Sequence, residues 1–411
     1  MTLSGSEHFS RSRLHLAKNP FFDQCHSVLL FALLLTGCAI GPDRLASSRM
    51  AYNEAVQITE QRELLLNIVR LRYHETPEFL SINSISSQFE LSSTAGISGE
   101  LDGGGRVTLI QPNAELGFAE RPTITFTPQQ GREFTRQLIA PVGPETLYRL
   151  IEYGWGLDRI FELAVRQINS VGTPIGLTRE ASESGSSLEL RRVISTLAEW
   201  QRRGLVILDM RDQFEAVSPL VPAGAVAAAD MIDAAKDGYR VLAKNNGYVL
   251  AQKTFSLMLH IDASLAKTQE WQRMAHDLDI DPDRQSYAID MADKRGQRTR
   301  KTSDTLYLET RSPLGIMAYL AQGVDVPVLD VQRHEVAPID TSIASLFRIQ
   351  TGDDEPQSAH LAVPHRGHWF YMQANDLTSR RSLGALISLL RLELEAGGTE
   401  NAPTLTLPVG Q

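Results

Sequence analysis

Cys38 is the residue of this chain whose surroundings indicate a definite chemistry. It follows an apolar run over residues 28–35 and two small residues, Thr36 and Gly37. Three basic residues precede the run: Arg11, Arg13 and Lys18. A helix over the run covers about 12 Å, far less than a bilayer core about 30 Å thick. This order of basic, apolar and small residues is the anatomy of a cleaved export signal. A buried cysteine in a hydrophobic helix and an uncleaved anchor are the alternatives.

The residues Leu35, Thr36, Gly37 and Cys38 resemble the lipobox that ends the signal peptides of bacterial lipoproteins. The resemblance implies a thioether-linked diacylglyceryl group on Cys38, cleavage between Gly37 and Cys38, and acylation of the new amino terminus. Residues 1–37 are then a signal peptide. Ala39 follows the cysteine in place of aspartate, which in enteric lipoproteins implies sorting to the outer membrane, on its periplasmic side. Several acyl chains would make attachment to the membrane effectively permanent.

A tether over residues 38–48 is expected to join this anchor to the folded body. It holds about ten residues, which span at most ~35 Å when fully extended. Ser47 and Ser48 are candidate N-caps for the first helix, expected over residues 49–73. The folded body is therefore expected to lie close to the membrane face.

Charge and cysteine content restrict the function further. The chain of 411 residues carries a formal net charge of −9, with 40 basic and 49 acidic residues. Such a balance does not suit nucleic-acid binding, which requires neutralisation of phosphates. Cys25 and Cys38 are the two cysteines. The first would leave with the leader and the second would be acylated, so the stability of the mature protein must come from packing.

Two groups of side chains have types that bind metals, and a simpler interpretation stands beside each. His360, His365 and His368 lie close in sequence, but zinc needs three or four converging ligands, and a surface turn explains them equally well. Asp277, Asp279, Asp281 and Asp283 alternate as calcium ligands can. Pro282 and Ala288 stand where an EF-hand needs glycine and glutamate, so an acidic loop is the simpler interpretation. No metal or other cofactor is predicted.

A basic run interrupts the acidic chain at Lys294, Arg295, Arg298, Arg300 and Lys301. Such runs are commonly solvated loops or hairpin tips, and in a membrane-held protein they can also contact anionic head groups or an acidic polymer. The run is short and lacks aromatic residues, so contact with nucleic acid is not expected.

The sequence shows no Gly-x-Ser-x-Gly elbow, no phosphate-binding loop and no His-Glu-x-x-His motif. We therefore expect an interaction or structural component of the cell envelope, held at the periplasmic face of the outer membrane, with the membrane and an envelope protein as partners. The alternative is a periplasm-facing hydrolase of an envelope polymer that uses a pair of carboxylates, which sequence alone cannot identify.

Hydrophobic periodicity predicts an α+β fold in three regions. Residues 49–127 should form a helix and a Gly-rich β region, in which Gly96, Gly99 and residues 103–105 mark turns. Residues 128–240 should be mainly helical, with helices over 129–138, 144–153, 157–169 and 186–203, and with a hairpin over 205–217. The helix over 186–203 and the hairpin over 205–217 together have the local pattern of a winged helix. Residues 241–411 should end in a ββαβ unit with strands over 358–363, 368–372 and 404–409 and a helix over 377–395 that is capped by Asp376.

Several stretches beyond Cys38 resemble a widespread group of uncharacterised bacterial envelope lipoproteins. The resemblance extends over most of the mature chain and implies no activity, cofactor or catalytic residue. The matching stretches are residues 52–55, 65–73, 122–126, 366–371 and 405–410.

Overall fold

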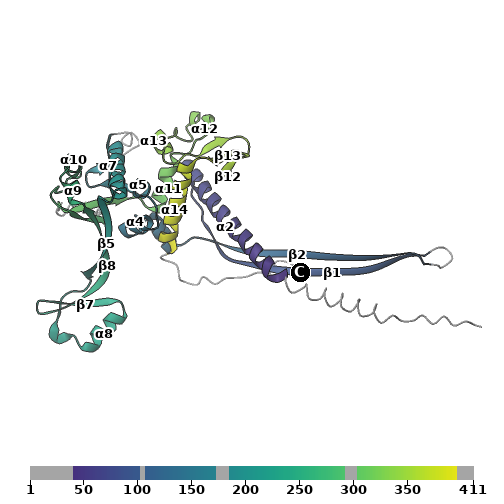
Figure 1. Ribbon diagram of the computed structural model, residues 1–411, viewed down its shortest axis with the longest axis horizontal. Coiled ribbons are helices and arrows are strands. Elements are labelled where there is room, and N and C mark those ends of the chain that lie inside the picture. Colours follow the sequence, from purple (N-terminus) through teal and green to yellow (C-terminus); the bar gives the residue numbers. More distant parts are fainter. Residues whose placement is uncertain (1–39, 102–106, 173–184, 292–302, 396–411) are drawn as a thin grey trace, which may run out of the picture. The chain divides into compact units, whose positions relative to one another are not determined.

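The structure is a computed structural model that describes residues 40–101, 107–172, 185–291 and 303–395 (Figure 1). The chain divides into two compact units, one up to Gln61 and one from Arg62 onward. Helices and β-sheets are both present, which confirms the α+β class. The predicted signal peptide, the glycines at 103–105, the basic run at 294–301 and the strand at 404–409 lie outside the described residues. The structure accordingly describes only the ββα part of the predicted ββαβ unit.

The first helix, α2 (Ile40–Arg72), begins earlier than the sequence predicted. Residues 40–48, predicted as part of a tether, are helical, and Ser47 and Ser48 lie inside the helix and not at its start. In the second unit, Leu65 and Ile68 of this helix are fully buried.

A hairpin of two long antiparallel strands follows, β1 (Leu80–Leu101) and β2 (Val107–Pro128). The prediction of turns at Gly96 and Gly99 is wrong, because the strand continues through both residues. Each is paired across the ladder, Gly96 with Asn113 and Gly99 with Ile110. Backbone pairing along the hairpin thus overrides the preference of glycine for turns.

The core of the second unit is built on an eight-stranded sheet with the order β4-β3-β10-β9-β8-β5, in which β6 and β7 also pair with β8. Strands β9 and β10 are parallel and the other pairs are antiparallel. Long strand β8 has neighbours along both edges. The strands are β3 (Val165–Ile168), β4 (Val171–Gly172), β5 (Val206–Ala216), β6 (Val221–Pro222), β7 (Tyr239–Lys244), β8 (Gly247–Ile261), β9 (Ser286–Met291) and β10 (Thr305–Thr310).

This sheet includes strands from both sides of residue 240, where the sequence predicted a boundary between regions. The region predicted as mainly helical supplies β3 to β6 and the start of β7, and these pair with strands from beyond residue 240. The predicted helix over 157–169 ends at Ala164, and the next four residues form β3 against β10. The predicted hairpin over 205–217 is one strand, β5, which pairs with β8 from Val206 to Ala216. The winged-helix pattern is therefore wrong.

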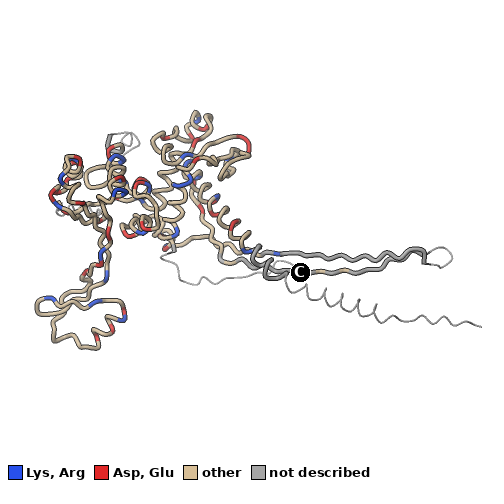
Figure 2. The backbone as a smooth tube through the Cα atoms, viewed as in Figure 1, with Lys and Arg blue, Asp and Glu red and all other residues tan. Residues whose placement is uncertain are grey.

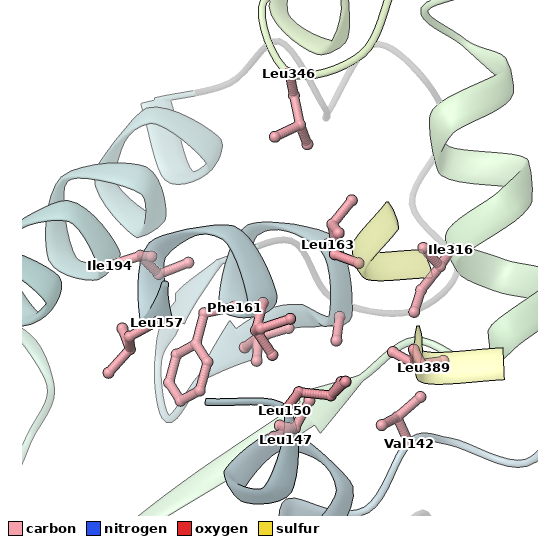
Figure 3. Packing of buried hydrophobic residues seen from close by; sticks show 14 of the residues in the cluster. Val142, Leu147, Leu150, Leu157, Phe161, Leu163, Ile194, Ile316, Leu346 and Leu389 are labelled. Carbon is pink, nitrogen blue, oxygen red and sulfur yellow. The ribbon is translucent and has the colours of Figure 1, made fainter. Parts of the chain in front are cut away.

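Helices surround the core of this sheet (Figure 3), where Leu147 and Leu150, Phe161, Ile194, Ile316 and Leu389 are side chains from five different helices. The fully buried aromatic rings include Trp200, Trp271 and Tyr287. The helices are α3 (Arg132–Ile139), α4 (Pro144–Glu152), α5 (Leu157–Ala164), α7 (Gly185–Arg202), α8 (Ala228–Lys236), α9 (Ala263–Ala266), α10 (Gln269–Asp277), α11 (Pro313–Ala321), α12 (Val328–Gln332), α13 (Thr341–Ala344) and α14 (Leu377–Glu395), with a 3₁₀ turn, η2, at Ala223–Ala225.

The C-terminal part follows the prediction closely. Strands β12 (Ala359–His365) and β13 (His368–Gln373) form a hairpin, and β11 (Gln350–Gly352) pairs with β13. Arg366 and Gly367 form the turn with φ of 50° and 83°. Asp376 caps α14, because its carboxylate accepts a hydrogen bond from the backbone N–H of Ser379 at 2.9 Å.

Candidate functional site

A pocket of about 420 Å³ opens where β10 passes into α11, beside α5, β3 and α7. Three arginines from three different elements line it: Arg166 of β3, Arg191 of α7, and Arg311 between β10 and α11. Basic and acidic positions are otherwise interspersed along the chain (Figure 2), as expected for an acidic protein with mixed surface charge. A cavity with three guanidinium groups is therefore the most distinctive chemical feature of the described residues.

Arg311 ties the end of the sheet to the end of α5. Its Nη1 donates to the carbonyl oxygens of Val165 at 2.8 Å and Leu163 at 3.1 Å. These carbonyls lie at the C-terminal end of α5, where the last C=O groups of a helix have no partner within it. The guanidinium carbon lies 3.9 Å from the centroid of the Tyr319 ring, which is a cation–π contact.

Burial lowers the pKa of Arg311 to about 10. Tyr319 opposes this lowering of the pKa, and the positive charges of Arg166 and Arg191 contribute to it. The group stays protonated at neutral pH. Its hydrogen-bond acceptors are neutral carbonyls, so its positive charge has no formal counter-charge among them.

Arg166 and Arg191 are only partly satisfied by the protein. Nη2 of Arg166 lies 3.7 Å from Oε2 of Glu309, while its Nε is buried and has no hydrogen-bond partner among the described residues. Burial lowers the pKa of Arg166, and Glu309 opposes this shift. Arg191 donates from Nη2 to the carbonyl oxygen of Ser342 at 2.9 Å, again to a neutral acceptor.

Glu162 is the carboxylate that lines this pocket. Burial raises its pKa, Arg159 and Arg191 lower it, and Asp158 raises it. Within the described part of the chain, no cation lies within ion-pair distance of Glu162. Three guanidinium groups against one carboxylate leave the lining positive, so the arrangement is suited to bind an anion and not a metal ion.

The first turn of α11 adds to the same electrostatic character. Ser312 caps this helix, because its Oγ accepts a hydrogen bond from the backbone N–H of Gly315 at 3.0 Å, and both residues line the pocket. The N-terminus of a helix carries a partial positive charge and favours anions.

None of the predicted site residues is among the described residues that line this pocket. Gly37, Cys38 and the five basic residues of the run at 294–301 fall outside the described residues, so their predicted roles stay predictions. The hydrolase hypothesis needs two facing carboxylates, and among its described lining residues this pocket offers Glu162 alone.

The three predicted histidines have different surroundings. Nε2 of His365 lies 3.1 Å from Oε2 of Glu75 without hydrogen-bond geometry, and burial lowers the pKa of this imidazole. Nδ1 of His368 lies 3.0 Å from Oδ1 of Asp353. Burial and the charge of Arg380 lower the pKa of His360.

The aspartates of the acidic run at 277–283 also have different surroundings. Asp277 accepts a hydrogen bond from Arg192 at 3.0 Å, and Asp281 lies 3.6 Å from Arg284. Asp279 adopts a φ of 56° in the turn after α10. No group of three or more possible metal ligands converges among the residues that the structure describes.

The arginine pocket was not predicted from the sequence, because Arg166 and Arg311 are far apart along the chain and only the pairing of β3 with β10 brings them together. Arg311 directly follows β10 and directly precedes the helix start Ser312-Pro313, but it is out of phase with the buried Leu306, Leu308 and Thr310, so no alternation in the sequence marks it as a buried residue.

Among the described residues, no helix combines the length and the apolar character that crossing a membrane requires. No protein-family model, curated protein or solved structure matches the chain.

Proposed function

We propose that the protein is a lipid-anchored component of the bacterial cell envelope, held through Cys38 at the periplasmic face of the outer membrane, and that it acts by association with other chains. The anchor is supported by the residues Leu35 to Cys38 and the apolar run before them. The role in association is supported by one observation, the β1–β2 hairpin.

The β1–β2 hairpin is a sheet of two strands. Among the described residues, β1 and β2 pair with each other and with no third strand. Each strand has 22 residues, which is about 70 Å of chain. An isolated two-stranded hairpin is marginal in water, and its open edges are templates for further strands. A hairpin of this length therefore gains stability when another strand adds to it.

The base of the hairpin is firmly held. Asn67 of α2 is fully buried, and its Oδ1 accepts a hydrogen bond from the backbone N–H of Glu78 at 3.0 Å. Glu63 accepts a hydrogen bond from the backbone N–H of Leu80 at 2.8 Å. The start of β1 is thus fixed to α2, which makes this hairpin, called the arm below, suitable for association.

The register gives this arm two different faces. Ile82 is paired with Phe126, and Ile124 lies two positions before Phe126 on the same face of β2, while Ser84 and Thr125 are paired on the other face. Phe126 and Ile124 are 54% and 41% exposed. Exposed apolar residues of this kind mark interaction surfaces.

The partner that fits this arm best is a second copy of the chain. Strands β1 and β2 have equal length and run in opposite directions, so β1 of one copy can pair antiparallel with β2 of the next. Such an association would continue the apolar face of one copy into that of its neighbour.

Two experiments test the two parts separately. Cys38→Ser should abolish the acyl mass on the protein and move it out of the membrane fraction, whereas Cys25→Ser, the matched control, should leave both unchanged. If the Cys38→Ser protein keeps an acyl mass and stays with the membranes, the anchor at Cys38 is refuted.

The association is tested by cross-linking in intact envelopes. Thr94 is exposed on β1, and Ser195, exposed on α7, is the matched control. With a bis-maleimide, Thr94→Cys should give dimers and higher multimers, and Ser195→Cys should give monomers. Thr94→Cys protein that remains monomeric, or that is linked only to a different chain, would refute pairing between copies.

A further inference from the structure

We propose that the pocket between Arg166, Arg191 and Arg311 is a binding site for a small organic anion with one carboxylate or phosphate group and a compact apolar body. This inference does not rest on the proposed function, because neither the anchor at Cys38 nor the hairpin contributes to the pocket.

The net positive charge of the pocket lining is the first argument for an anionic ligand. The lining holds three arginines and one glutamate, and Glu309 offsets Arg166 only at 3.7 Å. Like charges in a partly enclosed cavity repel one another, and burial makes each uncompensated charge costly. An anion would relieve both effects. A cation or a neutral ligand would relieve neither.

The hydrogen-bond donors at the pocket are the second argument for an anionic ligand. Within the guanidinium group of Arg311, the hydrogen bonds to the carbonyls at the end of α5 come from Nη1, and Nε of Arg166 is buried without a partner among the described residues. Ser312 and Gly315 place the positive end of α11 at the same cavity. Guanidinium groups and a helix N-terminus are the donors by which proteins recognise carboxylates and phosphates.

The rest of the lining sets the size and character of the ligand. A volume of about 420 Å³ falls in the range of cavities for small organic ligands and exceeds the needs of a bare ion. Apolar side chains also line it, among them Ile139, Leu190 and Ile194. These side chains would contact an apolar body while the anionic group meets the arginines.

The test measures binding by isothermal titration calorimetry with the full chain purified in a nonionic detergent. The probes are hexyl phosphate and hexanoate, with hexanol and hexyltrimethylammonium as neutral and cationic controls. Either anion should bind more tightly than both controls, and added salt should weaken this binding. Equal binding of hexanol and the two anions would overturn the proposal, because the heat would then reflect apolar contact alone.

A matched pair of variants on one helix tests the site itself. Arg191→Gln removes a lining charge, and Arg192→Gln removes the neighbouring charge, which is exposed and pairs with Asp277 outside the pocket. Arg191→Gln should weaken hexyl phosphate about tenfold, the value of one charge-assisted hydrogen bond. Arg192→Gln should leave it unchanged.

Folding of both variants is checked by their thermal unfolding. Equal affinities of the two variants, or no binding of either anion at millimolar concentration, would overturn the proposal. To separate two sources of the same chemistry, dihexanoylphosphatidic acid is compared with hexyl phosphate. If dihexanoylphosphatidic acid binds more tightly, the ligand is a lipid head group. If hexyl phosphate binds more tightly, the ligand is a free phosphate ester.

Discussion

Replacement of Arg311 by methionine tests whether the pocket is organised around a buried guanidinium group. Methionine keeps an unbranched apolar stem and loses the charge. The change removes two hydrogen bonds to the carbonyls of Leu163 and Val165 and the contact with the ring of Tyr319. It also removes the cost of burying a positive charge.

The magnitude follows from these opposing effects. Hydrogen bonds from a charged donor contribute about 2 kcal/mol each, and the cation–π contact about 1–2 kcal/mol. Burial lowers the pKa of Arg311 well below the usual value of a guanidinium group, to about 10. At about 1.4 kcal/mol for each pH unit, this burial costs about 3 kcal/mol. The contacts exceed the cost, so Arg311→Met should lower the free energy of unfolding by about 2 kcal/mol.

Urea unfolding followed by far-UV circular dichroism at neutral pH measures this difference. Arg192→Met is the control, because an exposed ion pair contributes about 0–1 kcal/mol. If Arg311→Met is as stable as the unchanged protein or more stable, the contacts of the guanidinium group do not offset its burial. The reasoning that places this group at the centre of a preformed pocket would then be refuted.

Three further changes test other parts of the fold. Gly323→Ala should lower the free energy of unfolding by more than about 2 kcal/mol, because a Cβ at this position would lie 2.0 Å from the carbonyl oxygen of Phe347. If the variant and the unchanged protein unfold at the same urea concentration, this close approach is contradicted. Burial, with the nearby carboxylate of Asp281, raises the pKa of Tyr287 to about 12, above its unfolded value of about 10. The native state therefore keeps a proton that the unfolded state loses, and about 3 kcal/mol of stability present below pH 10 should be lost as the pH rises towards 12. Tyr287→Phe should flatten this part of the stability curve, and parallel curves for the two proteins would contradict the assignment. Asp376→Ala should cost about 1 kcal/mol in thermal unfolding by removing the cap of α14, and Asp376→Ser should restore most of it.

The elements that the sequence predicted well are those specified by residues within a few positions. Pro144 at the start of α4 and Asp376 before α14 mark helix starts by the fixed φ of proline and by capping. Arg366 and Gly367 form the predicted turn because glycine accepts the positive φ that a tight hairpin needs. These signals act locally, so no tertiary partner is needed to recognise them.

The elements that the sequence predicted wrongly depend on partners far along the chain. Val165 and Ile168 are three positions apart, which suits a helix face, but β10 pairs with them and makes them a strand. The predicted hairpin over 205–217 would place a turn near Asp209 and Asp212. Both lie within β5, where Met258 and Phe255 of β8 are their partners. Pairing with a distant strand supplied the backbone hydrogen bonds that local propensity did not anticipate.

The sequence by itself determined the chemical setting of Cys38, the helix caps and the tight turn, because each depends on neighbouring residues and on the backbone geometry that those residues prefer. Only the tertiary structure decided that Arg166, Arg191 and Arg311 share one cavity. The pairing of β3 with β10 and the packing of α7 bring these three charges together. A pattern of neighbouring residues cannot show which side chains distant in sequence will lie close enough to repel one another.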